Sequence, residues 1–300
     1  MAGANSVRTI LYALGANSSI AVAKLVAAVI TGSSAMLAEG IHSLADAGNQ
    51  VLLLIGLRRS RTPPDPTHPL GYGKAIYVWS FLVAIVLFSV GGMYSLIEGW
   101  HKLHDPHPLS WPWLAIGILV FAIFAEGVSL RAAIQEINKV RGQRSLWRWF
   151  RESRASELVV IFGEDLAALL GLVFALLAVA LTMLTGNPVF DAIGTLGIGA
   201  LLVIIALLIG LEVKAMLIGE SVDPLQLARM RTFLEAHPSV GELLNLLTYQ
   251  LGKDAMVAMK IRVAADSAEG LVEKINQLER DFRQAFPAVI WLFVEPDIER

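Results

Sequence analysis

Long apolar segments alternate with short polar connections through the first two thirds of the chain. Apolar runs occur at residues 9–29, 35–57, 76–96, 114–130, 158–184 and 189–210. An α-helix rises about 1.5 Å per residue, so about 20 apolar residues cross the hydrocarbon core of a bilayer. The pattern therefore predicts a polytopic α-helical membrane protein with six transmembrane helices.

The pattern of the remaining chain, residues 212–300, is typical of a water-soluble domain. Residues 224–236 and 268–286 are predicted helices, and residues 243–249, 256–263 and 289–294 are predicted strands. This order of elements is roughly ferredoxin-like. We therefore expect a six-helix transmembrane domain over residues 1–211, followed by a cytoplasmic α+β ferredoxin-like domain over residues 212–300.

Composition and charge agree with this division and add an orientation. Only 17% of the residues are charged and 55% are hydrophobic, whereas soluble domains carry about 25% charged residues. Lys and Arg gather in the connection after residue 57 and again over residues 131–154, while the opposite side has Lys102 alone. Basic loops stay in the cytoplasm. The chain is therefore expected in the cell inner (plasma) membrane, multi-pass, with both termini cytoplasmic.

Other features of the composition exclude some classes of function. The chain has no cysteine, so it has no disulfide and no thiolate metal site. The basic run at residues 131–154 is explained by topology and anionic lipid, so nucleic-acid binding is not expected. The N-terminus lacks a small-residue cleavage pattern, and we expect no removable signal peptide. No nucleophile constellation indicates an enzyme.

The second apolar segment carries four polar residues on one helical face: Glu39, His42, Asp46 and Asn49. An imidazole and a carboxylate one turn apart can ligate a divalent cation together, and they can also carry protons. Ionisable groups at membrane depth predict an ion or proton pathway. The alternatives are a purely structural polar face in a membrane helix and the wet face of a helix in a soluble bundle.

The sequence Glu39-Gly-Ile-His-Ser-Leu-Ala-Asp46, together with six spans and the α+β tail, resembles the cation diffusion facilitator family. Asn17, Lys24, residues 32–34 and the run His68-Pro-Leu-Gly-Tyr-Gly-Lys74 fit the family pattern too. Residues 163–171 and 186–191 resemble a subgroup that includes human zinc transporter nine and bacterial relatives. The resemblance covers nearly the whole chain.

The resemblance implies a dimeric exporter of divalent metal, driven by proton antiport, with its metal site midway across the membrane. By position, His42 and Asp46 form one pair of ligands and Asp165 is half of the second pair. The other half falls on Ile161, which has no ligand atom. Glu164 is the candidate replacement, although it lies about 100° from Asp165 around a helix. Asn17, Glu39, Asn49 or a water molecule are the other candidates for the fourth position.

Two further positions bind metal in some members of this family. In the loop after the second span, Asp65 and His68 match that pattern, but Tyr72 stands where a second histidine often stands, so a structural role is the alternative. In the cytoplasmic domain, the zinc positions fall on Leu244, Lys260, Phe293 and Glu295. We therefore expect no zinc there, and we expect this domain to serve mainly in dimerisation.

A last cluster, outside the family pattern, comprises His101, His104, Asp105 and His107. The spacing of His101 and His104 is plausible for metal ligands. The alternative is that they are interfacial histidines near Trp100.

Together these observations predict an exporter of a divalent cation that works by proton antiport. Ligands lose protons when they bind metal, so protons and metal compete for the same site. Imidazole with carboxylates favours Zn²⁺, and Mn²⁺ and Fe²⁺ are the alternative cargoes. The expected partners are the divalent metal ion, protons, membrane lipid and a second copy of the chain, with no prosthetic group. A non-transporting scaffold or sensor with the same fold is the remaining alternative.

Overall fold

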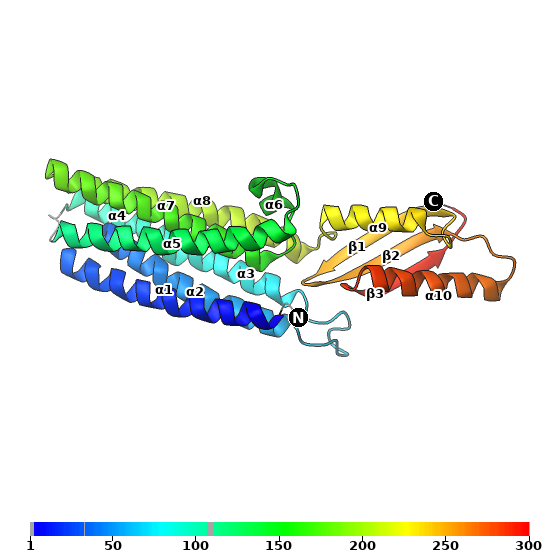
Figure 1. Ribbon diagram of the computed structural model, residues 1–300. Helices are drawn as coiled ribbons and strands as arrows, with labels where there is room; N and C mark the ends of the chain where they lie inside the picture. Colours follow the sequence, from blue (N-terminus) through cyan, green and yellow to red (C-terminus); the bar gives the residue numbers. More distant parts are fainter. Residues whose placement is uncertain (1–2, 33, 107–110, 300) are drawn as a thin grey trace.

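The computed structural model describes residues 3–32, 34–106 and 111–299 (Figure 1). The long helices lie side by side in one elongated bundle, and the sheet domain follows at one end of it. The bundle is formed by α1 (Gly3–Thr31), α2 (Ser34–Ser60), α5 (Pro112–Val140), α7 (Ser156–Thr185), α8 (Val189–Ile218) and the continuous run α3 (Ala75–Val86), η1 (Leu87–Met93) and α4 (Tyr94–His104). We call the opposite end of the bundle the far end.

In the part of the chain that the structure describes, four helices are long enough and apolar enough to cross a membrane. These helices are Ala75–His104, Pro112–Val140, Ser156–Thr185 and Val189–Ile218. In α1 the apolar part, Asn17–Thr31, is shorter, and α2 carries six polar residues between its ends and closes with Arg58 and Arg59. The expected multi-pass helical domain is therefore present. Of the six predicted spans, four are confirmed among the described residues.

Three helices extend well past the apolar runs that predicted them. The predicted span 76–96 continues to His104, the span 114–130 to Val140, and the span 189–210 to Ile218. Parts of the connections that were expected between spans are therefore helical. Polar residues at the end of an apolar run can continue the helix beyond the hydrocarbon core. A short helix follows, α6 (Leu146–Glu152), and Ser145 caps it by accepting a hydrogen bond from the backbone N–H of Arg148.

The C-terminal part is an α+β domain with three strands among its described residues. Its elements are α9 (Pro224–Ala236), β1 (Glu242–Leu251), β2 (Asp254–Arg262), α10 (Ala268–Ala285) and β3 (Val289–Pro296). The sheet order is β1-β2-β3, with β1 antiparallel and β3 parallel to β2. A ferredoxin-like fold contains a βαββαβ set of elements. The α+β class is confirmed, but the ferredoxin-like fold is not.

Side-chain alternation along β2 explains how this domain is packed. Ala255, Val257, Met259 and Ile261 are buried against α9 and α10, because successive side chains of a strand point to opposite faces. Both helices therefore cover the same face of the sheet. The other face, which carries Ala258, stays open.

Backbone contacts join the tip of the β1–β2 hairpin to the start of α3. A Cβ on Gly73 would lie 2.1 Å from the carbonyl oxygen of Leu251, so only glycine allows this approach. Lys74 donates hydrogen bonds to the Tyr249 hydroxyl and the Leu217 carbonyl at 2.8 and 2.6 Å. The Tyr77 hydroxyl accepts from the backbone N–H at 252. The bundle and the sheet domain are thus in direct contact.

Candidate functional site

The polar face of α2 points into the bundle. Glu39, His42, Asp46 and Asn49 are all buried, while Leu44, on another face of the helix, is exposed. His42 Nε2 lies 3.5 Å from Asp46 Oδ2. Polar residues inside and apolar residues outside are the arrangement that a membrane imposes on a helix. This observation excludes the wet face of a soluble bundle.

The two acidic residues of α7 face different neighbours. Glu164 Oε1 accepts a hydrogen bond of 2.6 Å from the side-chain amide of Asn49 on α2. Asp165 Oδ2 accepts one of 3.0 Å from the Ser129 hydroxyl on α5. Adjacent residues on a helix point about 100° apart, and the two contacts follow from that geometry. Both carboxyl groups are buried.

Two contacts fix the relative level of α2 and α7, which run in opposite directions (Figure 1). The Asn49–Glu164 bond is one. The other is Gly171, where a Cβ would lie 2.5 Å from Glu39 Oε1. At equal helical rise, Asp46 then lies at the level of about residues 164–167. The structure thus brings the level of Asp46 to that of Asp165, and Asp165 contributes to the electrostatic environment of Asp46.

Several buried atoms of this cluster lack a hydrogen-bond partner among the described residues. They are both ring nitrogens of His42, Asp46 Oδ1, Asn49 Oδ1 and Glu39 Oε1. Buried polar atoms in folded proteins are normally paired. A nitrogen and several oxygens left unpaired on one helix face are suited to a mobile polar ligand, such as water, protons or a cation.

The conformation described is not a closed metal site. In the part of the chain that the structure describes, no three His, Asp or Glu side chains converge on one point. His42 and Asp46 are together, Glu164 is bonded to Asn49, and Asp165 is bonded to Ser129. Ile161, at the position of the fourth family ligand, packs against the apolar core of the bundle.

Lys24 of α1 adds a buried cation next to this cluster. Its ammonium is 0% exposed and lies 2.6 Å from the Ser43 hydroxyl and 3.4 Å from Glu39 Oε2. Ser43 and Ser129 were not predicted from the sequence as residues of the site. Ser43 could have been found from its spacing, because it lies four residues after Glu39, whereas nothing in the sequence indicates that Ser129 lies next to Asp165. Asn17, two helical turns before Lys24, is only partly buried.

The loop candidates Asp65 and His68 form a local structural network. Asp65 accepts hydrogen bonds from the Thr67 hydroxyl, the Tyr72 hydroxyl and the backbone N–H groups of Thr67 and His68. These bonds, that of the Thr67 hydroxyl first, hold the pKa of the Asp65 carboxyl well below its usual range. The His68 and Tyr72 rings lie 4.1 Å apart. The arrangement favours the structural role.

The histidines near the far end are not brought together as ligands within the described residues. His104 is engaged with Trp100, through a contact of 2.9 Å to its carbonyl oxygen and a ring separation of 4.5 Å. His101 is exposed on α4. The candidate His107 lies outside the described residues.

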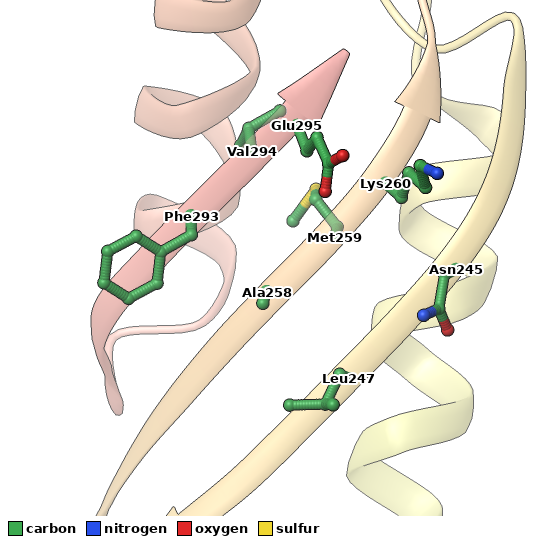
Figure 2. A pocket seen from close by; sticks show the side chains of 8 residues that line it. All are labelled: Asn245, Leu247, Ala258, Met259, Lys260, Phe293, Val294 and Glu295. Carbon is green, nitrogen blue, oxygen red and sulfur yellow. The ribbon is translucent and has the colours of Figure 1, made fainter. Parts of the chain in front are cut away.

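The open face of the sheet carries two rows of side chains across the strands (Figure 2). One row is apolar, with Leu247, Ala258 and Phe293 in register, and the other is polar, with Asn245, Lys260 and Glu295. They line a groove of about 240 Å³. Lys260 pairs with Asp297, whose hydrogen bond raises the pKa of the lysine, while the pKa of Asp297 falls to about 2.

Long apolar helices, a buried cluster of ionisable side chains and a C-terminal α+β domain define a polytopic membrane protein of the cation-transporter class. A family model described as the cation efflux transmembrane domain matches residues 10–218. The chain therefore belongs to the cation efflux family, which is a family of transporters and not of enzymes.

Three relatives show how far the similarity extends. The chain is 37% identical over 261 residues to the mitochondrial proton-coupled zinc antiporter SLC30A9 of Xenopus laevis, covering 86% of this chain and 46% of that protein. It is 36% identical over 267 residues to the Homo sapiens protein of the same name, covering 87% and 46%. Metal tolerance protein C4 of Arabidopsis thaliana is 32% identical over 226 residues, covering 74% and 49%. The chain spans about half the length of these curated relatives.

These comparisons confirm the family resemblance and the subgroup that includes human zinc transporter nine. They also correct one expectation. The plasma-membrane location inferred from the basic loops is wrong, because the SLC30A9 proteins to which the chain is similar are named as mitochondrial and point to a mitochondrial membrane. The distribution of Lys and Arg reports on which side of a membrane a loop lies, but it does not identify the membrane.

Proposed function

We propose that this chain exports a divalent cation, zinc first, in exchange for protons, through a site formed by His42, Asp46 and Asp165. One observation carries the proposal: a buried imidazole–carboxylate pair with unpaired atoms, at the level of a second buried carboxylate on the facing helix. Relatives named as proton-coupled zinc antiporters support zinc as the cargo and protons as the exchanged ion.

The chemistry of the site couples the two ions. A carboxylate or imidazole must be free of its proton to bind a metal, so each arriving cation displaces protons and each arriving proton weakens the hold on the cation. His42 provides the nitrogen that Zn²⁺ favours, and Asp46 and Asp165 provide the negative charge. No covalent chemistry is needed, only access from one side of the membrane at a time.

The contacts of the described conformation indicate what changes when the ion binds. Asp165 is held toward α5 by Ser129, away from His42 and Asp46. To join a cation on α2, Asp165 must exchange the Ser129 hydroxyl for the metal. Glu164 can become a ligand only by leaving Asn49. We therefore assign Glu164 and Asn49 to the support of the site, with Glu39 and Asn17 as accessory polar groups along the pathway.

Manganese is the second candidate cargo. The manganese efflux protein MneP of Bacillus subtilis is 39% identical over 88 residues, 29% of this chain. The candidate site has more oxygen than nitrogen atoms, and oxygen ligands suit Mn²⁺. The same donor set admits Fe²⁺.

The two domains have different roles in this proposal. Residues 1–211 carry transport, and lipid covers exposed apolar side chains such as Phe121, Phe124 and Leu177. Residues 212–300 serve in homodimerisation. The open sheet face supports this role, because Leu247 and Phe293 are about half exposed on it and a second copy would cover them.

The test is uptake of Zn²⁺, Mn²⁺ and Fe²⁺ into proteoliposomes with an imposed pH gradient. We expect the native chain to move Zn²⁺ fastest, and Asp46→Asn and Asp165→Asn to lose gradient-driven uptake. Asp191→Asn, which changes a buried aspartate outside the cluster, is the matched control and should retain uptake. Uptake by Asp46→Asn and Asp165→Asn at the rate of the native chain would show that these residues do not form the transport site. Absence of uptake by the native chain would favour the scaffold or sensor.

A further inference from the structure

Lys24 occupies a position that the transport site does not explain. It is a fully buried ammonium within a bundle of apolar helices, and it contacts two groups on α2, Ser43 and Glu39. A buried charge is costly unless it is paired. Glu39 supplies the pairing charge through Oε2, yet its second oxygen, Oε1, has no hydrogen-bond partner among the described residues. The pair is therefore only half satisfied.

The pair lies on the far-end side of the candidate transport site. Helix α2 begins at the far end and runs toward the sheet domain (Figure 1). Glu39 precedes His42 by three residues, so it lies about 4.5 Å closer to the far end. On the facing helix α7, Gly171 follows Asp165 by six residues in the same direction, and it borders Glu39 Oε1. A cation that leaves His42 and Asp46 for the far end therefore meets the Lys24–Glu39 pair next.

The shape of α7 at this level is adapted to Glu39. A side chain at position 171 would collide with Glu39 Oε1, because its Cβ would lie 2.5 Å from that oxygen. The glycine leaves room for Glu39 Oε1 between α2 and α7, while the other oxygen, Oε2, faces Lys24. Glu39 thus has the ammonium of Lys24 at one oxygen and an unpaired oxygen toward α7.

We propose that Lys24, held by Glu39 and Ser43, is the barrier on the far-end side of the transport site, and that Glu39 receives the outgoing cation when Lys24 moves away. The ammonium repels a divalent cation at short range in a medium of low dielectric constant. It also takes the place beside Glu39 that the cation would occupy. Exit then requires exchange of the ammonium for the divalent cation at Glu39, which keeps the buried carboxylate paired with a cation throughout. This inference rests on the proposed function for the direction of transport.

The test compares Lys24→Met, which keeps an unbranched side chain of nearly the same length and removes its charge, with Lys24→Arg, which keeps the charge. Zn²⁺ flux and proton flux are recorded together in the proteoliposomes. If Lys24 is the barrier, Lys24→Met still passes Zn²⁺ down its gradient but moves about half as many protons per ion or fewer, because the cation leaks past the coupling site. Lys24→Arg should keep the native ratio. Lys102→Met, at a second buried lysine that contacts the Gly32 carbonyl, is the matched control.

A second measurement does not depend on transport. The chain has no cysteine, so His42→Cys introduces a single thiol at the site. In sealed vesicles, a membrane-impermeant thiol reagent is applied from the far-end side. We expect the thiol at position 42 to be labelled about tenfold faster when Lys24→Met is added. Such a rate change corresponds to a modest decrease in the free-energy barrier for access of the reagent. Addition of Lys102→Met should leave the rate unchanged.

The outcomes separate the two proposals. Equal labelling rates with and without Lys24→Met, or an unchanged ratio of protons to Zn²⁺ in Lys24→Met, overturn the barrier and leave Lys24 a structural ion-pair partner. Faster labelling in Lys24→Met supports the barrier even if the native chain moves none of the three metal ions. In that case only the proposed function fails.

Discussion

The side-chain amide of Asn49 on α2 donates a hydrogen bond of 2.6 Å to Glu164 on α7. Both residues are buried, and together they join two helices that are 115 residues apart at this point of the sequence. The bond fixes the level at which α2 meets α7, and that level sets Asp46 opposite the region of Asp165. The arrangement of the candidate site therefore depends on a contact between two residues that need not touch the cation.

Replacement of Asn49 by Ala should destabilise the protein by about 1–2 kcal/mol, because Glu164 is left buried without its donor. Glu164→Gln, whose side-chain oxygen can still accept the bond, should lose less. Thermal unfolding in detergent measures the difference. If Asn49→Ala unfolds at the native temperature, the bond does not hold α2 to α7.

His42→Asp should shift the preference of the transporter from Zn²⁺ toward Mn²⁺. The substitution exchanges the only candidate nitrogen donor for oxygen, and oxygen ligands favour Mn²⁺. Competition between the two ions for uptake into proteoliposomes measures the ratio. An unchanged ratio would mean that His42 does not contact the cation, and Asp191→Asn controls for general effects of the substitution.

Gly171→Ala should destabilise the protein by about 1 kcal/mol, because its Cβ would lie 2.5 Å from Glu39 Oε1 and the carboxylate, which is paired with Lys24, would have to move aside. Gly117→Ala is the matched control in α5, since no atom lies within 4 Å of its added Cβ. The control should be neutral or slightly stabilising. Thermal unfolding of both variants decides, and equal melting temperatures would show that Glu39 is not confined by α7.

Gly73→Ala should loosen the contact between the bundle and the sheet domain. The added Cβ would lie 2.1 Å from the Leu251 carbonyl oxygen, and backbone atoms on both sides leave no room to adjust. We expect faster proteolysis near Gly219, where the chain passes from α8 into the sheet domain. Gly127→Ala, which meets no atom within 4 Å, should be cut at the native rate. Equal rates for the two variants would contradict the contact.

Asp297→Asn should lower the stability of the protein near neutral pH, and the difference should vanish in acid. The Lys260 ammonium holds the pKa of Asp297 at about 2, below its unfolded value of about 4. A depressed folded-state pKa gives stability that is present above pH about 4 and is lost as the pH falls toward 2. Denaturant unfolding of both proteins between pH 7 and about 2 tests this. Parallel pH profiles of the two proteins would exclude the contribution.

The sequence by itself determined the class of this protein and half of its candidate site. Apolar runs long enough to cross a bilayer predict the helical bundle, because hydrocarbon tolerates few polar groups. The spacing of Glu39, His42, Asp46 and Asn49 places them on one face of α2, since helical periodicity is a local property. The α+β tail was predicted for the same reason, from alternation along its strands.

Only the tertiary structure decided which residues meet across the bundle. The Asn49–Glu164 bond, the Asp165–Ser129 bond and the pairing of Lys24 with Glu39 join different helices. Their geometry depends on how each helix is rotated and shifted against its neighbour, and the packing of the whole bundle sets that. The sequence also did not determine how the three strands pair, because strand pairing is a long-range property that alternation within one strand does not specify.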